Sequence, residues 1–137
     1  MNKPIIYLAG NMSPSPKYYN IWTNRITGKL SKKFRLSPSN FKQGTKFIVR
    51  QDLGRLNNAH ILVVNLGVSD LSHHLTGLVV ECYEAYKQNI PVYAFVSDEL
   101  ARSQQADAPW LSEFITHEFE NEDNLVKYLL EDENLLV

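Results

Sequence analysis

Residues 60–96 decide the fold of this chain, and they read HILVVNLGVSDLSHHLTGLVVECYEAYKQNIPVYAFV. Two nearly continuous apolar runs, HILVVNL and IPVYAFV, stand on either side of a polar loop and a segment with helical spacing. Strands that are apolar along their whole length are typical of a parallel sheet covered on both faces. The stretch therefore predicts a buried strand, a helix over residues 77–88 and a second buried strand, joined by a right-handed crossover.

The alternation of strands and helices continues in both directions along the chain. Upstream, PIIYLAG predicts a first strand ending at Gly10, followed by a helix over residues 18–30, a short strand in KFRLSPS and a helix over about residues 44–57. Downstream, PWLSEFI, THEFE and EDNLVKYLLED predict a short helix, a weak strand and a final amphipathic helix. We expect one α/β domain over residues 1–137, a compact flavodoxin-like, doubly wound sheet of about five parallel strands with helices on both faces.

Composition narrows the class of protein. The chain has 137 residues and a net charge of −1, so bulk electrostatics does not favour binding to a nucleic acid polymer. The basic residues near position 32 are expected to form a helix end and turn. The single cysteine, Cys82, and the absence of a long apolar run or leader pattern predict a cytoplasmic protein without a membrane segment. A metal site is not expected, because the adjacent His73 and His74 point apart and have no histidine or cysteine partner at ligand spacing. No cofactor is expected either, since the chain has no glycine-rich nucleotide-binding loop.

Glu81 is the first candidate site residue. On a helical wheel it lies at the shoulder of the apolar face of the helix over residues 77–88, which comprises Leu78, Val79, Cys82, Ala85 and Tyr86. A carboxylate there is partly desolvated and close to the ends of the strands, where ligands bind in such sheets. It could serve as a nucleophile toward a sugar. The alternative is a solvated helix charge, since first turns favour acids.

Asp52 and Tyr7 are the other two candidates, each with a structural alternative. Asp52 lies late in the helix that precedes HILVVNL, where an acid opposes the helix dipole; it is either solvated or functional. Tyr7 lies in the first strand, as a buried core tyrosine or as a phenol that orients a carboxylate. Gly10, at the end of the same strand, allows a close backbone approach or turns the chain.

The order of these segments resembles the nucleoside 2-deoxyribosyltransferase family. The resemblance rests on IIYLAG, Trp22, IVRQDLGRLNNAHILVVNL, GLVVE and IPVYAFV, and it covers nearly the whole chain. Tyr7 and Gly10 match the family's first strand, Asp52 matches the acid that opens its second motif, and Glu81 with Gly77 matches its G-x-x-x-E helix. Two positions depart from the pattern: Leu75 stands where an acid or serine is usual, and His60 where an aspartate is frequent.

The resemblance implies cleavage of an N-glycosidic bond through a covalent glycosyl–glutamate intermediate. Glu81 would be the nucleophile, Tyr7 would hold its side chain and Asp52 would contact or protonate the leaving base. Further substrate contacts are expected from Gly10, Asn11, Met12, Trp22, Asn65 and Gly77, although the spacing favours core packing for Trp22. The partner is a small nucleoside or nucleotide. A homodimer or higher homo-oligomer is expected too, and Trp110, Phe114 and the terminal LLV are apolar enough to be buried in it.

Three alternatives stay open from the sequence. The chain could be a nucleoside 5′-monophosphate N-hydrolase, with loop serines, Thr76 and Lys17 near the phosphate. It could be a binding module that keeps a nucleoside or nucleotide site without turnover. It could also be an unrelated flavodoxin-like phosphate binder, although it lacks a glycine-rich phosphate loop.

Overall fold

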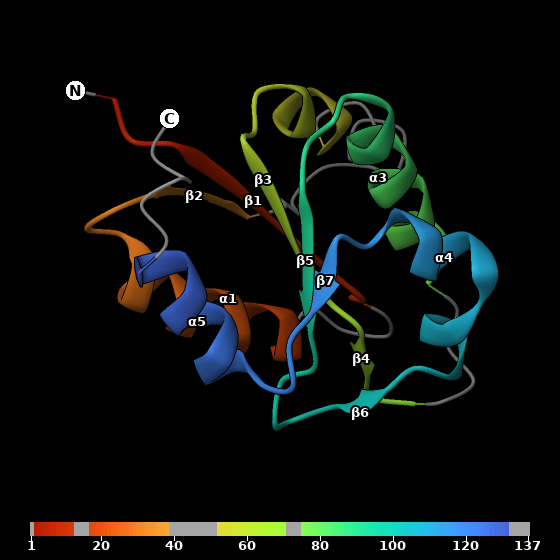
Figure 1. Cartoon of the computed structure of the whole chain (residues 1–137). Coiled ribbons are helices and arrows are strands. Elements are labelled where there is room, and N and C mark those ends of the chain that lie inside the picture. The colour runs from red at the N-terminus through yellow and green to blue at the C-terminus, as the bar shows by residue number, and fades with distance from the viewer. Residues whose placement is uncertain (1, 13–16, 39–51, 71–74, 132–137) are drawn as a thin grey trace.

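The chain forms a five-stranded parallel sheet, shown in Figure 1. The computed structural model describes residues 2–12, 17–38, 52–70 and 75–131. The strand order is β2-β1-β3-β5-β7, and every pairing between neighbours is parallel. The strands are β1 (Ile5–Gly10), β2 (Arg35–Pro38), β3 (Ile61–Asn65), β5 (Val92–Phe95) and β7 (His117–Glu118). This flavodoxin-like order confirms the predicted fold class. The chain adds β2 on one side of β1 and the later strands on the other side, so the strand order reverses between β1 and β3.

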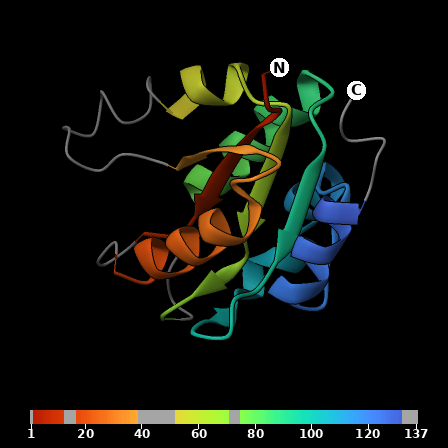
Figure 2. The ribbon, with the colours of Figure 1, turned by 90° about the vertical axis from the view of Figure 1, so that its left-hand side faces the viewer.

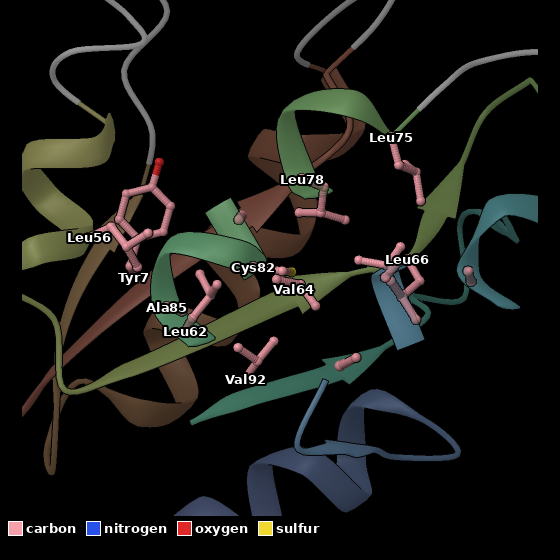
Figure 3. Close-up of a cluster of buried hydrophobic side chains, with 14 of the residues drawn as sticks. Tyr7, Leu56, Leu62, Val64, Leu66, Leu75, Leu78, Cys82, Ala85 and Val92 are labelled. Carbon is pink, nitrogen blue, oxygen red and sulfur yellow. The ribbon is translucent and has the colours of Figure 1, made fainter. Parts of the chain in front are cut away.

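Helices cover both faces of the sheet, as Figures 1 and 2 show. On one face, α1 (Lys17–Leu30) and α5 (Glu122–Glu131) pack over a cluster of buried apolar side chains. On the other face, α3 (Thr76–Lys87), α4 (Pro109–Phe114) and the helical residues 52–57 enclose a second cluster, shown in Figure 3. The first part of the predicted helix over residues 44–57 lies outside the described residues. None of the helices in the described ranges is long and apolar enough to span a membrane.

The buried side of α1 includes a tyrosine that the apolar spacing did not single out. Tyr18 and Ile21 are exposed, whereas Tyr19 is buried and donates a hydrogen bond from its hydroxyl to the Leu8 carbonyl at 2.7 Å. Trp22, Ile26 and Leu30 are buried as expected. The apolar spacing gave the helix correctly, but it could not show which of two adjacent tyrosines reaches a buried acceptor.

Basic side chains of α1 and of the turn after it bond to α5, which is Glu122–Glu131. Arg25 donates two hydrogen bonds, of 2.8 and 2.6 Å, to the Glu122 carboxylate at the start of α5, and Lys29 adds a contact of 3.0 Å. Burial alone would raise the pKa of Glu122, but the hydrogen bonds from Arg25 and Lys29 outweigh it and lower this pKa. Lys33 donates to the Leu129 and Leu130 carbonyls of α5. These bonds agree with the interpretation of the cluster as a helix end.

Two short elements were not predicted. β4 (Gly67–Val68) and β6 (Ala101–Arg102) pair as a two-stranded antiparallel ribbon, and the 3-10 turn η1 (Gln104–Asp107) follows β6. β4 lies in the polar loop expected after HILVVNL, and no element was predicted over the segment that contains β6. A two-residue strand carries no periodicity that a sequence could reveal.

Gly10 is required for packing at the end of β1. A Cβ atom at this position would lie 2.8 Å from Cζ2 of the buried Trp22. We expect Gly10→Ala to destabilise the protein by about 1–3 kcal/mol, because a closely packed indole cannot move away freely. Gly28→Ala is the control, since an added Cβ there meets nothing within 4 Å and alanine favours a helix. Urea unfolding of both variants measures the difference, and equal stabilities would contradict this account.

Candidate active site

Tyr7 and Glu81 lie close together, and Asp52 lies close enough to raise the pKa of both. They come from β1, from the helical residues 52–57 and from the second turn of α3. Burial raises the pKa of the Tyr7 hydroxyl far above its ordinary value, and the charges of Glu81 and Asp52 raise it further. Figure 3 shows Tyr7 beside Leu56 in the cluster beneath α3. The structure thus brings together three residues that lie 29 or more positions apart in the sequence.

Glu81 has the most perturbed carboxyl group of the three-residue group. Burial raises its pKa from 4.5 to about 7, the nearby Tyr7 hydroxyl opposes this rise, and the charge of Asp52 adds to it. At neutral pH the carboxyl is therefore close to half ionised. A carboxyl with a strongly raised pKa and a charged neighbour is a candidate functional group on physical grounds.

The contact between Tyr7 and Glu81 is close but incomplete. Oη of Tyr7 and Oε2 of Glu81 are buried, and neither finds a partner with normal hydrogen-bond geometry among the described residues. The Tyr7 hydroxyl still stabilises the carboxylate enough to oppose the rise in its pKa. Buried polar atoms that lack a partner are rare in folded proteins and call for an explanation. The unsatisfied oxygen atoms of Tyr7 and Glu81 therefore mark this group of residues as a candidate site.

A Tyr7→Phe variant is expected to shift the titration of Glu81 upward. Removing the hydroxyl takes away a group that favours the ionised form, so the pKa of Glu81 should rise above about 7. If the hydroxyl completes its hydrogen bond to the carboxylate during the reaction, its loss corresponds to a roughly 10- to 100-fold effect on any activity that uses this carboxylate at pH 7. Carboxyl ¹³C NMR measures the midpoint. Tyr19→Phe is the control, since its hydroxyl bonds the Leu8 carbonyl; equal midpoints in the two variants would contradict the interaction.

Asp52 faces Arg55 on the same helix. The distance between Asp52 Oδ1 and Arg55 Nη1 is 3.8 Å, and Arg55 also donates a hydrogen bond of 3.2 Å to the carbonyl of Pro38 at the end of β2. Arg55 therefore connects this helix to the edge of the sheet. A carboxylate held in this way could accept or donate a proton at a group bound near Glu81.

Two residues that were expected to contact a substrate, Asn65 and Trp22, form contacts within the protein instead. The Asn65 amide donates to Ser97 Oγ at 2.8 Å and accepts from the Gly67 and Ser97 backbone N–H groups at 2.9 and 3.3 Å. It therefore joins the end of β3 to the segment after β5. Trp22 is fully buried between the rings of Tyr19 and Phe95, in the cluster on the face of the sheet opposite Glu81. Its position agrees with the core-packing alternative.

The remaining expected contacts lie near the ends of β1 and α3. Asn11 and Met12 follow β1 and are half-buried, and Met12 packs against the cluster under α1 and α5. Gly77 is exposed in the first turn of α3. Residues 71–74, which include both adjacent histidines, lie outside the described residues. Across the described ranges, no group of three or more His, Cys, Asp or Glu side chains is placed to hold a metal ion.

Leu75, His60 and Cys82 have structural roles. Leu75, six positions before Glu81, is buried in the cluster beneath α3. His60 accepts a hydrogen bond from the Ile5 backbone N–H at 2.9 Å through Nδ1. Cys82 follows Glu81 and is fully buried, and burial raises the pKa of its thiol. A contact that the sequence did not predict joins Leu75 to Gln105, 30 residues away.

Known proteins resemble this chain in fold, but not in sequence. The sequence matches no protein-family model and no curated protein. A conserved protein from Enterococcus faecalis V583 matches with a TM-score of 0.66 and 19% identity, over 94% of this chain and 98% of that one. The fold also resembles that of a deoxyribosyltransferase. This is the 2-deoxyribosyltransferase from Leishmania mexicana, with a TM-score of 0.52 and 18% identity over 69% of this chain and 65% of that one.

A third structural neighbour has a different activity. DNA processing protein A from Helicobacter pylori, which binds single-stranded DNA, matches with a TM-score of 0.58 and 11% identity, over 96% of this chain and 82% of that one. One sheet architecture thus occurs in proteins with different functions, and function has to be argued from the site. The comparisons support a fold related to that of the deoxyribosyltransferases.

Proposed function

We propose that this chain cleaves the N-glycosidic bond of a nucleoside or nucleotide and passes the sugar to a second base or to water. The observation that carries the proposal is the convergence of Tyr7 and Asp52 on the buried carboxyl of Glu81. The fold shared with the Leishmania mexicana enzyme supports it. Such a fold binds ligands at the carboxyl ends of its strands, near the reversal between β1 and β3.

The proposed reaction has two displacements. In the first, the Glu81 carboxylate forms a bond to the anomeric carbon as the bond to the base breaks. The electron pair of that bond stays on the base nitrogen, which takes a proton from Asp52 or from water. In the second, an acceptor base or water attacks the anomeric carbon and the Glu81 carboxylate leaves, while the proton of the acceptor goes to the solvent or to Asp52. Both steps pass through a cation-like sugar that a nearby carboxylate stabilises.

Tyr7 supports this chemistry by holding Glu81. Its hydroxyl favours the ionised form of the carboxyl, which is the form that attacks. Burial acts in the opposite direction and keeps the carboxyl poorly solvated, so that it is a stronger nucleophile once ionised. The balance places the pKa of Glu81 at about 7. We therefore expect activity to rise with pH through neutrality, with a midpoint near pH 7.

One chromatographic assay tests the proposal. The protein is incubated with a panel of deoxyribonucleosides, ribonucleosides and their 5′-monophosphates, with and without a free acceptor base. Release of free base, or formation of a new nucleoside, is the expected result, and the two products separate hydrolysis from transfer. Ligand-induced thermal shifts without any product would instead indicate a binding module, and the absence of both would contradict the proposal.

We further infer a single-domain, cytoplasmic protein that assembles as a homo-oligomer. Large aromatic side chains are exposed along α3 and α4, and the Trp110 side chain is 75% exposed. The rings of Tyr83 and Tyr86 lie 5.5 and 5.1 Å from that of Phe114, so these three side chains form one aromatic group. Aromatic surface of this kind is typical of protein interfaces. Light scattering tests the assembly, and the mass of one chain would contradict it.

A further inference from the structure

The helix that carries Glu81 begins without a cap from its own side chains. Leu75 is the N-cap residue of α3, and its side chain makes no capping hydrogen bond. It points into the buried cluster instead, as Figure 3 shows. Backbone N–H groups at the start of a helix need partners from outside the helix. The N–H of Leu75 finds one in the Gln105 side chain, whose Oε1 accepts at 2.6 Å.

Gln105 is itself fixed in place by the turn that contains it. The backbone N–H of Gln105 donates to Ser103 Oγ at 3.2 Å, and the N–H of Ser103 donates to the Leu66 carbonyl at 2.9 Å. The next residue, Ala106, is buried in the cluster beneath α3. The turn η1 is therefore attached to the end of β3 and to the core, and it presents Gln105 to α3 from a rigid support.

Arg102 attaches the same turn to the far edge of the sheet. Its guanidinium donates to both oxygens of Glu118 in β7, at 3.0 and 2.9 Å. It also donates to both oxygens of Asp107 in η1, at 2.9 Å each. Bidentate contacts of this kind fix orientation as well as distance. The start of α3 is thus linked through Gln105, η1 and Arg102 to β7.

We propose that Gln105 is a positioning residue for Glu81, because it holds the first turn of α3 and so sets the carboxyl of Glu81 against Tyr7. Glu81 lies six residues after Leu75, which corresponds to roughly 9 Å along a helix. A shift at the start of α3 is therefore transmitted over less than two turns. The effect on activity rests on the proposed function, whereas the effect on the placement of Glu81 does not.

The first test measures the backbone of α3. In Gln105→Ala the N–H of Leu75 loses its acceptor, and its hydrogen exchange is expected to become about tenfold faster or more. Gln104→Ala is the matched control, because Gln104 is the exposed neighbour in the same turn and should leave this exchange unchanged. Gln105→Glu should restore slow exchange, since a carboxylate also accepts the bond and a negative charge suits a helix N-terminus. Circular dichroism checks that each variant is folded.

The second test follows Glu81 itself, by ¹³C NMR of its carboxyl during a pH titration. In Gln105→Ala the midpoint should fall from about 7 toward 4.5, because a loosened α3 admits water to the carboxyl. With an active substrate, kcat should fall while KM changes little. Wild-type exchange at Leu75, or an unchanged Glu81 midpoint, would overturn the proposal. If no substrate in the panel is turned over, the proposed function fails, but these two readouts still decide the role of Gln105.

Discussion

Glu81→Gln is expected to abolish base release, with a loss of about 10⁴-fold or more in kcat. The amide that replaces the carboxylate cannot form the bond to the anomeric carbon, and it cannot stabilise a positive charge on the sugar. Glutamine has nearly the same size as glutamate, so the packing of α3 over the cluster of Leu78 and Cys82 is retained. Base release from the best substrate, followed by chromatography, measures the loss.

The matched control for this variant is Glu84→Gln. Glu84 lies on the same helix, three residues further on, and pairs with Lys87 at 3.0 Å near the surface. A surface ion pair of this kind contributes little to stability, so the control should keep wild-type activity. Wild-type rates in Glu81→Gln, or equal losses in both variants, would eliminate Glu81 as the nucleophile.

The same Glu81→Gln substitution is expected to stabilise the protein at alkaline pH. In the folded protein the pKa of Glu81 is about 7, against 4.5 for an ordinary glutamate. Below about pH 4.5 the carboxyl is protonated in both the folded and the unfolded chain, so the wild type loses no stability from burying a charge. Between the two values the unfolded chain ionises first, so the stability of the wild type falls as pH rises. Above about pH 7 the loss in the free energy of unfolding is complete, on the order of 3 kcal/mol.

Urea unfolding of the wild type and of Glu81→Gln at several pH values measures this difference. The two free energies of unfolding should be similar near pH 4 and should separate by roughly 2–3 kcal/mol in favour of the variant by pH 8.5. Glu84→Gln should show no such separation, because its carboxylate is not buried in the core. A constant difference across the pH range would mean that Glu81 is not desolvated in the folded protein.

Much of the fold could be predicted because a parallel sheet leaves a strong trace in the sequence. β3 is buried at every position, and its five residues are accordingly apolar except for Asn65. The position of Glu81 at the shoulder of α3 also followed from helical spacing. Tyr86, however, was placed on the buried face and is 51% exposed. Because the short α4 packs against the flank of α3, it covers only part of that ring.

The parts of the site that could not be predicted depend on contacts between distant segments. Asn65 was expected to contact a ligand, but its amide is used by Ser97, 32 residues away. The bond from Leu75 to Gln105 spans 30 residues and depends on η1, a turn of four residues with no distinct pattern. The spacing of residues within one helix or strand carries no information about such pairings. They become visible only when the turns between elements are placed.

The burial of Cys82 has a practical consequence for spectroscopy. It is the chain's one cysteine, it lies fully inside the core, and its thiol stays protonated at ordinary pH. The thiolate is the form that reacts with maleimides and iodoacetamides, so this side chain should resist labelling in the folded protein. A cysteine introduced on an exposed helix position would then be the preferred point of attachment for a fluorophore or spin label. Distances between α3 and the opposite face could be followed in this way without removing the native sulfur.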